Sequence, residues 1–164
     1  MNLTARKVSL FGLIASIAMI IFAIAYFQMY KGFEPCPLCI LQRMGVSAVA
    51  IVFLLAALHN PSRIGNVVYS LLGFIAACLG GAVSIRHLWL QHLPQDAIPQ
   101  CSPGYDYIVD NFPLMDAIPM LLKGSGECSE TLWSLIGLSI PAWTLVAFVF
   151  LAIINLSKLW TKTS

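Results

Sequence analysis

The chain has 164 residues, of which 59% are hydrophobic and 10% are charged, with a formal net charge of +2. A typical soluble domain carries about 25% charged residues, so a soluble globule of this composition could not cover its surface with polar groups. The composition excludes a cytosolic enzyme, a disordered tail and a nucleic-acid-binding protein with a basic patch. The sequence therefore predicts an integral membrane protein.

Four segments are long and apolar enough to cross a bilayer, because a spanning helix needs about 20 residues. They cover approximately residues 8–27, 40–58, 66–85 and 141–159. A short breaker from His59 to Arg63 separates the second from the third, and Pro141 suits the first turn of the fourth. We predict an all-α membrane protein in which residues 1–164 form one four-transmembrane-helix bundle. Residues 28–39 and 86–140 then form two extracytoplasmic loops.

The first apolar segment also resembles a cleavable signal peptide, because two basic residues precede it and Ala23–Ala25 is a candidate cleavage site. Its apolar run is longer than the usual stretch of about 7–15 residues and continues through Phe27. We therefore expect this segment to be retained as the first span.

The distribution of charge predicts the orientation of the four spans. One side of the predicted membrane carries basic residues without acidic ones, namely Arg6, Lys7, Arg63, Lys158 and Lys162. All seven acidic residues fall on the other side, and six of them lie in the 86–140 connection. Both termini are therefore expected to be cytoplasmic.

The positions of the cysteines suggest two disulfides. Cys36, Cys39, Cys101 and Cys128 all fall in the predicted extracytoplasmic loops, and disulfides persist in oxidising compartments such as the bacterial periplasm. Four cysteines allow three pairings, and the natural one joins cysteines of the same loop, Cys36 with Cys39 and Cys101 with Cys128. Cys78 lies inside the third span among small residues, where we expect it to be a packing residue.

The Cys36-Pro37-Leu38-Cys39 motif is the feature that points to chemistry. A disulfide across so short a loop adds little stability, which argues against a membrane scaffold whose disulfides only fix its loops. A Cys-x-x-Cys pair is more often redox-active or metal-binding. Zinc needs four ligands near one point, and the chain offers only His87 and His92 nearby, without a second Cys-x-x-Cys. Redox chemistry at the membrane surface is therefore the leading hypothesis, with no metal.

Arg43 strengthens this hypothesis. It follows Cys39 by four residues, so the two share one face of a helix. A guanidinium and a helix N-terminus both favour the thiolate, which is the reactive form of cysteine. The alternative is that Arg43 only extends to the membrane interface, as arginines near span ends do, although ionisable residues within spans are functional candidates by default.

With these features the chain resembles the disulfide bond formation protein B (DsbB) family of bacterial inner membranes. The resemblance rests on the four spans, the Cys-x-x-Cys within Pro35–Cys39, Arg43, the second cysteine pair, Trp133 and the Pro141-Ala142-Trp143 run. Another quinone-linked thiol enzyme, vitamin K epoxide reductase, is an alternative. There the Cys-x-x-Cys follows the loop cysteines, whereas here it precedes them.

The resemblance implies a thiol:quinone oxidoreductase that reoxidises a DsbA-like periplasmic thiol oxidase and so sustains periplasmic disulfide formation. Cys101 would form the mixed disulfide with the DsbA-like partner, and Cys128 would then exchange with Cys36. Cys39, paired with Arg43, would pass the electrons to ubiquinone or menaquinone of the membrane pool.

Two residues beyond the third span are further candidates for quinone contacts, in addition to Arg43. His87 and Gln91 are spaced i, i+4 in the region where the family places such contacts. His92 is one step off that face, and we expect it to be structural. Trp133 and Trp143 fit either the redox site or an aromatic belt at the interface. The apolar run at residues 112–122 fits either an interfacial helix or a packed loop helix.

Overall fold

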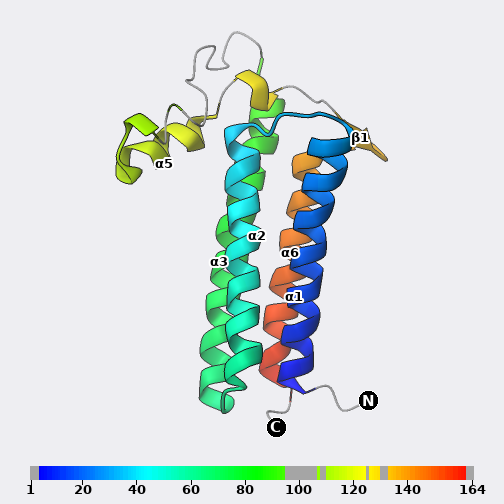
Figure 1. Ribbon diagram of the computed structural model, residues 1–164, viewed down its shortest axis with the longest axis vertical. Helices are drawn as coiled ribbons and strands as arrows, with labels where there is room; N and C mark the ends of the chain where they lie inside the picture. Colours follow the sequence, from blue (N-terminus) through cyan, green and yellow to red (C-terminus); the bar gives the residue numbers. More distant parts are fainter. Residues whose placement is uncertain (1–3, 95–106, 108–109, 125, 130–132, 162–164) are drawn as a thin grey trace.

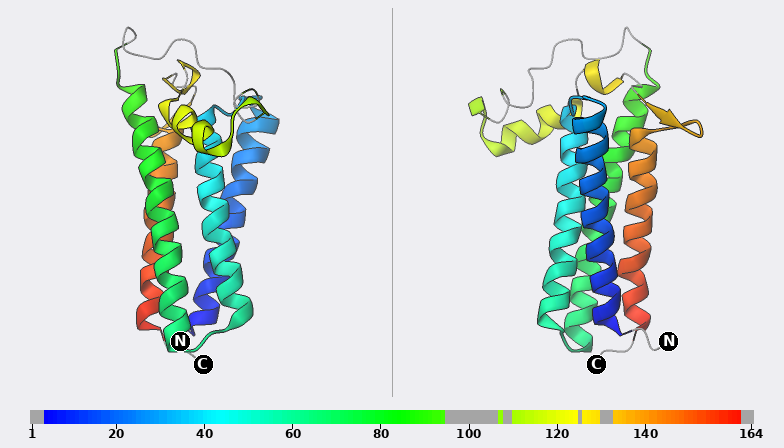
Figure 2. Two further views of the ribbon diagram at one scale, coloured as in Figure 1. Left: turned by 90° about the vertical axis from the view of Figure 1, so that its left-hand side faces the viewer. Right: turned by 45° about the vertical axis from the view of Figure 1, so that its right-hand side comes forward.

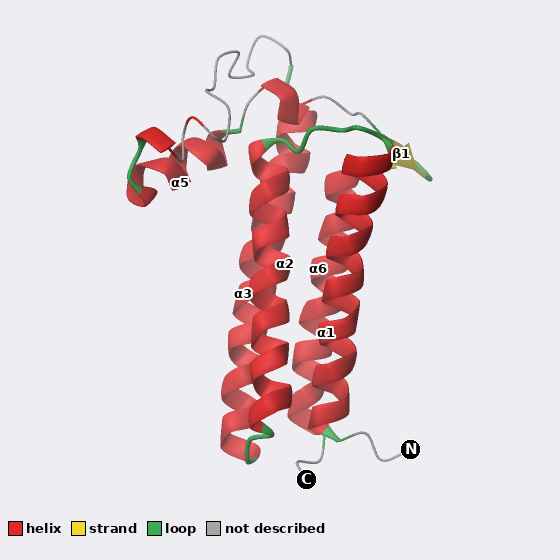
Figure 3. Ribbon diagram, viewed as in Figure 1, coloured by secondary structure: helices red, strands yellow, loops and turns green. Residues whose placement is uncertain are grey.

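The computed structural model describes residues 4–94, 107, 110–124, 126–129 and 133–161. Among these residues, four helices are long and apolar enough to cross a membrane: Ala5–Tyr30, Pro37–His59, Arg63–Gln91 and Ile140–Trp160. They stand side by side in one bundle (Figure 1; Figure 3). The prediction of a four-helix membrane protein is confirmed.

The four long helices are built from these elements. The first joins α1 (Ala5–Phe22) to a π-helical segment, η1 (Ala23–Tyr30), while α2 (Pro37–His59) and α3 (Arg63–Gln91) are continuous. The fourth joins α6 (Ile140–Ser157) to a 3-10 turn, η4 (Lys158–Trp160). Pro37 lies in the first turn of α2, where its missing N–H costs nothing. Asn60, in the left-handed conformation at φ 40°, ends that helix before Pro61.

The connection between α3 and α6 carries the remaining elements at one end of the bundle. They are helix α5 (Leu114–Lys123), the 3-10 turn η3 (Gly126–Ser129) and the strands β1 (Ser134–Leu135) and β2 (Leu138–Ser139). The two strands pair antiparallel, with Ser134 opposite Ser139. Helix α1 begins and α6 ends at the opposite end of the bundle, as the views of Figure 2 also show.

Small residues allow the helices to pack closely around two buried aromatic rings. Phe53 of α2 and Phe148 of α6 are both fully buried. Gly12 of α1 lies against the Phe53 ring, and Gly80 of α3 lies against the Phe148 ring. Close contacts of this kind, rather than a hydrophobic effect between helices, hold membrane bundles together.

The outer surface of the bundle is apolar, as a lipid-facing surface must be. Its exposed side chains include Ile14, Leu54, Leu71 and Ile153. Cys78 is also exposed, so the expectation that it packs inside the bundle is wrong. Ala77 is on the buried face of α3, and the next residue in a helix points about 100° away from it.

Helix α3 continues beyond the predicted end of the third span. The apolar run stops at Ile85, but the helix continues to Gln91. Arg86 stabilises this extension, since its guanidinium stacks 4.4 Å from the Trp89 ring centroid and its Nε donates to the carbonyl of Leu122. His87 and Gln91 therefore lie on the last turns of α3, while the limits of the membrane along each helix stay predictions.

Candidate functional site

Cys36 and Cys39 lie at the start of α2. Cys36 is the extended residue that precedes the helix, and Cys39 lies in its first turn. The Cys36 thiol donates a hydrogen bond to the Cys39 sulfur, with 3.3 Å between the two Sγ atoms. Both residues are thiols in this structure, so their pairing as a disulfide stays a prediction.

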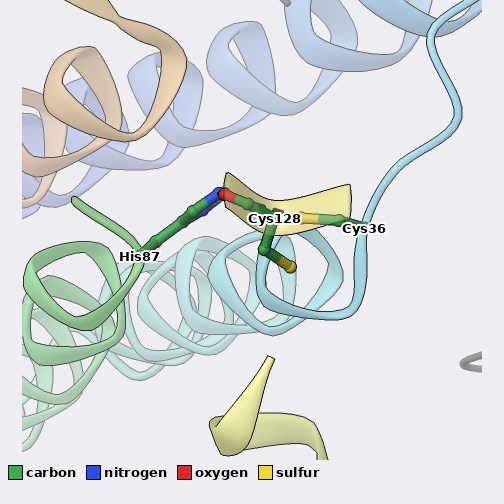
Figure 4. A group of neighbouring side chains, drawn as sticks. All are labelled: Cys36, His87 and Cys128. Atoms are coloured by element: carbon green, nitrogen blue, oxygen red, sulfur yellow. Dashed lines mark hydrogen bonds between the residues drawn. The ribbon is translucent and has the colours of Figure 1, made fainter. Parts of the chain in front are cut away.

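Cys128 of η3 lies beside Cys36, although the two residues are 92 positions apart in the sequence. The two Sγ atoms and a ring nitrogen of His87 all lie within 4.8 Å of one another. Figure 4 shows the three side chains gathered where α3, η3 and the start of α2 meet. The structure thus brings together the two cysteines that the resemblance pairs in an exchange. Cys101 lies outside the described residues, and the Cys101–Cys128 disulfide stays a prediction.

Apolar packing holds Cys128 at this place. Cys128 is 0% exposed and belongs to a buried cluster with Cys36, Leu38 and Leu90. Gly124 provides the turn from α5 into this cluster at φ 77°, a conformation that side chains with a Cβ disfavour. A Cβ at Gly124 would also lie 2.6 Å from Cδ1 of Leu90. The absence of a side chain at Gly124 therefore allows the backbone to pass close to Leu90 on its way to Cys128.

Helix α5 is anchored on one side and exposed on the other. Leu121 is buried against Leu41, Phe112 and Met120. Met115 and Ile118 remain exposed. Residues 112–122 therefore have features of both a packed loop helix and an interfacial helix. Helix α5 packs on α2 through Leu121, and its exposed apolar side chains suit a helix in the membrane interface.

His87 is buried between the cysteines and α2. Its Nε2 lies 3.1 Å from the carbonyl oxygen of Cys128 and 3.9 Å from Sγ of Cys36. Its Nδ1 lies 3.3 Å from the amide nitrogen of Gln42, which is also buried. His92, in contrast, is exposed and bonds only the Leu88 carbonyl of its own helix among described residues, as expected for a structural residue.

The environment of Cys36 keeps its sulfur protonated. A hydrogen bond with Cys128 lowers the pKa of the Cys36 thiol, but the hydrogen bond to Cys39, burial and the charge of Cys39 outweigh it and raise the pKa to about 12. At neutral pH Cys36 is therefore a thiol that donates to Cys39. In the reduced pair Cys39 is the sulfur that accepts this hydrogen bond, and it is the one better suited to nucleophilic chemistry.

We expect iodoacetamide to alkylate Cys39 before Cys36 in the reduced protein at pH 7–8. Alkylation requires the thiolate, and a pKa of about 12 leaves Cys36 protonated over this range. Cys36 is also 7% exposed, whereas Cys39 is partly exposed. Peptide mapping by mass spectrometry at successive times measures the order of labelling. Equal labelling rates at neutral pH would contradict the assignment.

A cavity of about 650 Å³ opens beside the cysteines, between α1, α2, α3 and α6. Cys36 and Cys39 line it, as do all three residues predicted to contact quinone, Arg43, His87 and Gln91. Much of the remaining wall is apolar, with aromatic rings from Phe27, Trp133 and Trp143. The indole of Trp133 meets the Phe27 ring edge to face, with 5.1 Å between centroids. Both tryptophans therefore belong to the site.

Polar groups in this wall are oriented by neighbouring residues. Arg43 donates to Oε1 of Gln28 at 2.8 Å and to the carbonyl of Ala23 at 3.4 Å. A guanidinium has five N–H donors, so others remain for a ligand. Oε1 of Gln91 accepts a hydrogen bond from Ser139 at 2.8 Å, which leaves the Gln91 amide NH2 to donate. An apolar cavity with a few directed donors fits a flat molecule with carbonyl oxygens, such as a quinone.

The donor atoms of Cys36, His87 and Cys128 also form the kind of group that holds a metal ion. Structural zinc sites use four protein ligands, and this group has three among the described residues. The Nε2 atom that would face the metal is within hydrogen-bond distance of the Cys128 carbonyl. The geometry suits thiol exchange better than metal binding.

Sequence reasoning missed Gln42 and the contribution of the first span to the cavity. Gln42 is a polar side chain within an apolar run, and such residues inside spans are functional candidates, so a signal was present. No comparable signal marks Phe27 or Ala23, because they are apolar residues in an apolar helix.

Comparison with known proteins identifies the family. A family model described as "Disulfide bond formation protein DsbB" matches residues 5–157. A protein of Nitrosococcus oceani named Disulfide bond formation protein B is 49% identical over 95% of this chain and 92% of its own length. Proteins of the same name from Methylococcus capsulatus and Psychrobacter sp. are 45% and 43% identical over 96% of this chain and 95% and 93% of theirs. The chain therefore belongs to the DsbB family, whose members are thiol:quinone oxidoreductases.

Proposed function

We propose that this chain reoxidises a DsbA-like periplasmic thiol oxidase and passes the electrons through its two cysteine pairs to a membrane quinone. DsbB proteins reoxidise DsbA and transfer electrons to quinone, and membership of the family carries this activity to the chain. One observation supports the proposed route most directly: Cys36 lies beside both Cys39 and Cys128, and Cys39 borders the cavity.

The proposed relay consists of thiol–disulfide exchanges, each of which is the attack of a thiolate on a sulfur. A thiolate of the DsbA-like partner attacks Cys101 of the Cys101–Cys128 disulfide, and Cys128 leaves as a thiolate. Cys128 attacks Cys36 of the Cys36–Cys39 disulfide, so a Cys36–Cys128 bond forms and Cys39 leaves as a thiolate. When the second thiol of the partner completes its own disulfide, Cys101 re-forms its bond with Cys128 and releases Cys36. Cys36 and Cys39 then close their disulfide and give up two electrons.

A bound quinone supplies the electron acceptor, since it takes up two electrons and two protons to become a quinol. Arg43 and the Gln91 amide are the groups of this chain that would orient the quinone oxygens in the cavity. The side chains of Phe27, Trp133 and Trp143 would exclude water from the ring. Ubiquinone and menaquinone both fit this description.

The four apolar helices fit a multi-pass protein of the bacterial inner membrane. We propose that the cysteine end of the bundle faces the periplasm. The absence of acidic residues among the basic residues at the opposite end supports this orientation. Labelling of single cysteines placed at Thr4 and Ile136 with a membrane-impermeant maleimide in intact cells would distinguish the two ends.

The experiment that tests the relay is quinone reduction without oxygen. The purified protein receives reduced DsbA and either ubiquinone or menaquinone, and the loss of quinone absorbance is followed. Catalytic reduction that depends on both DsbA and this chain supports the proposal, and the relative rates identify the preferred quinone. No reduction with either quinone, in protein that carries both disulfides, would contradict it.

Replacement of Arg43 by His should weaken the use of quinone. The shorter side chain cannot keep the bonds to Gln28 and Ala23, and it removes a permanent charge from the cavity. We expect the KM for quinone to rise by about tenfold, which corresponds to about 1.4 kcal/mol. The Cys101–Cys128 disulfide should still form, as thiol counting shows. Unchanged quinone kinetics would contradict the assigned role.

A further inference from the structure

The imidazole of His87 is engaged at both nitrogens, and this determines where its hydrogen lies. Nε2 is 3.1 Å from the carbonyl oxygen of Cys128, and Nδ1 is 3.3 Å from the amide nitrogen of Gln42. A carbonyl only accepts hydrogen bonds, so Nε2 carries the hydrogen. The amide nitrogen only donates, so Nδ1 presents its lone pair. The ring is therefore a neutral Nε2–H tautomer held from two sides.

These hydrogen bonds connect three elements inside the protein. Gln42 comes from α2, His87 from α3 and Cys128 from η3, and their side chains are 3%, 3% and 0% exposed. The bond from His87 holds the Cys128 backbone, and the Cys128 sulfur lies within 4.8 Å of the Cys36 sulfur. Gln42 in turn determines which nitrogen of His87 donates. Because the Gln42 amide donates to Nδ1, that nitrogen carries no hydrogen, and the hydrogen is on Nε2, where it bonds the Cys128 carbonyl.

We infer that Gln42 and His87 are positioning residues for the exchange between Cys128 and the Cys36–Cys39 disulfide. The inference rests on the proposed relay and adds a task for two residues that do not react. His87 keeps Cys128 beside Cys36, and Gln42 keeps His87 in the tautomer that can do so. His87 borders the cavity but has no nitrogen left to bond a quinone oxygen, so its task differs from the quinone contact expected from the sequence.

The exchange needs such positioning because its two sulfurs come from different segments of the chain: Cys36 directly precedes α2, and Cys128 lies in the connection between α3 and α6. Cys128 lies on a 3-10 turn of only four residues, which has little stability of its own. Holding the Cys128 thiolate near the Cys36 sulfur raises the effective concentration of the two reacting groups and orients them for the attack. One S–S bond forms and one breaks in this step, and Cys39 leaves with the negative charge. No oxidant or reductant is therefore required.

The test isolates this step in the full chain with Cys101→Ala, with the quinone extracted and no DsbA present. Cys128 then has only the Cys36–Cys39 disulfide to attack. Acid quenching, alkylation and peptide mapping measure the ratio of Cys36–Cys128 to Cys36–Cys39 disulfide. We expect His87→Leu to lower this ratio by about tenfold, equivalent to about 1.4 kcal/mol. His87→Gln should restore part of it, because its amide NH2 can again donate to the Cys128 carbonyl.

Two further variants sharpen the test. Gln42→Met keeps the side-chain volume but removes the group that donates to Nδ1 of His87. We therefore expect this variant to lower the ratio of Cys36–Cys128 to Cys36–Cys39 disulfide by about threefold. The matched control is His92→Leu, which should leave the ratio unchanged. His92 directly follows the helix that carries His87, but it is exposed, and among described residues its side chain bonds only the Leu88 carbonyl of that helix. In turnover with reduced DsbA, His87→Leu should lower kcat while the KM for quinone stays within twofold, a split that loss of a quinone contact would not produce.

The outcomes separate this inference from the proposed relay. If the Cys101→Ala parent forms the inter-loop disulfide and His87→Leu forms as much, the positioning role is wrong and the relay stands. If the parent forms none, the relay fails and the positioning role fails with it. If His87→Leu does not fold, Gln42→Met decides, because a ratio equal to the parent's overturns the role.

Discussion

Replacement of Cys39 by Ser should reduce quinone turnover by about 10³-fold or more, the scale on which removal of a nucleophile acts in enzymes. Cys36 and Cys39 are the only cysteines that line the cavity among the described residues, and two electrons are released only when these two sulfurs close their disulfide. Without Cys39 the electrons have no sulfur from which to leave. Loss of quinone absorbance under anaerobic conditions, with reduced DsbA as donor, measures the effect.

The Cys39→Ser protein should nevertheless oxidise one equivalent of DsbA, because its Cys101–Cys128 disulfide is intact. A single stoichiometric oxidation without quinone reduction would therefore distinguish a broken relay from a misfolded protein. Cys78→Ser is the matched control: Cys78 is exposed on the outer face of α3, away from the cavity. It should retain full turnover. Sustained quinone reduction by Cys39→Ser would contradict the order of electron transfer.

Much of this fold follows from simple properties of the sequence. Composition and the lengths of the apolar runs predict the four helices, and the i, i+4 spacing of Cys39 and Arg43 predicts that both lie on one helix face, which in the structure borders the cavity. These features are local, because they depend on helix geometry within one segment. Arg43, His87 and Gln91 were predicted to contact quinone from spacing and family resemblance together. The structure places all three in one cavity wall, and contacts with quinone stay predictions.

The features that sequence reasoning missed depend on contacts between segments. The buried face of α3 is set by which neighbours it meets, so the small residues around Cys78 did not reveal that Cys78 itself points outward. The approach of Cys128 to Cys36 depends on the turn at Gly124 and on Leu90, far apart in the sequence. The predicted third span stops at Ile85 because hydropathy falls at Arg86, and the sequence did not show that the helix itself continues to Gln91, where Arg86 stacks on Trp89.

Replacement of Gly80 by Ala should destabilise the packing of α3 against α6. A Cβ at Gly80 would overlap the ring of Phe148, which is fully buried and cannot move without disturbing its neighbours. Overpacking of a filled core costs about 1–3 kcal/mol. The same contact holds α3, and therefore His87, in place against α6. We expect a lower unfolding midpoint in detergent together with lower quinone turnover.

The adjacent Gly81 supplies the control. A Cβ there would lie 3.7 Å from Cδ1 of Leu145, an ordinary contact, and Ala is favoured over Gly inside a helix by up to about 1 kcal/mol. Gly81→Ala should therefore be neutral or stabilising. Phe148→Leu should rescue Gly80→Ala, since a smaller side chain makes room for the added methyl, and a double-mutant cycle measures the coupling. Equal stability of the Gly80→Ala and Gly81→Ala proteins would show that α3 and α6 do not approach each other through Gly80.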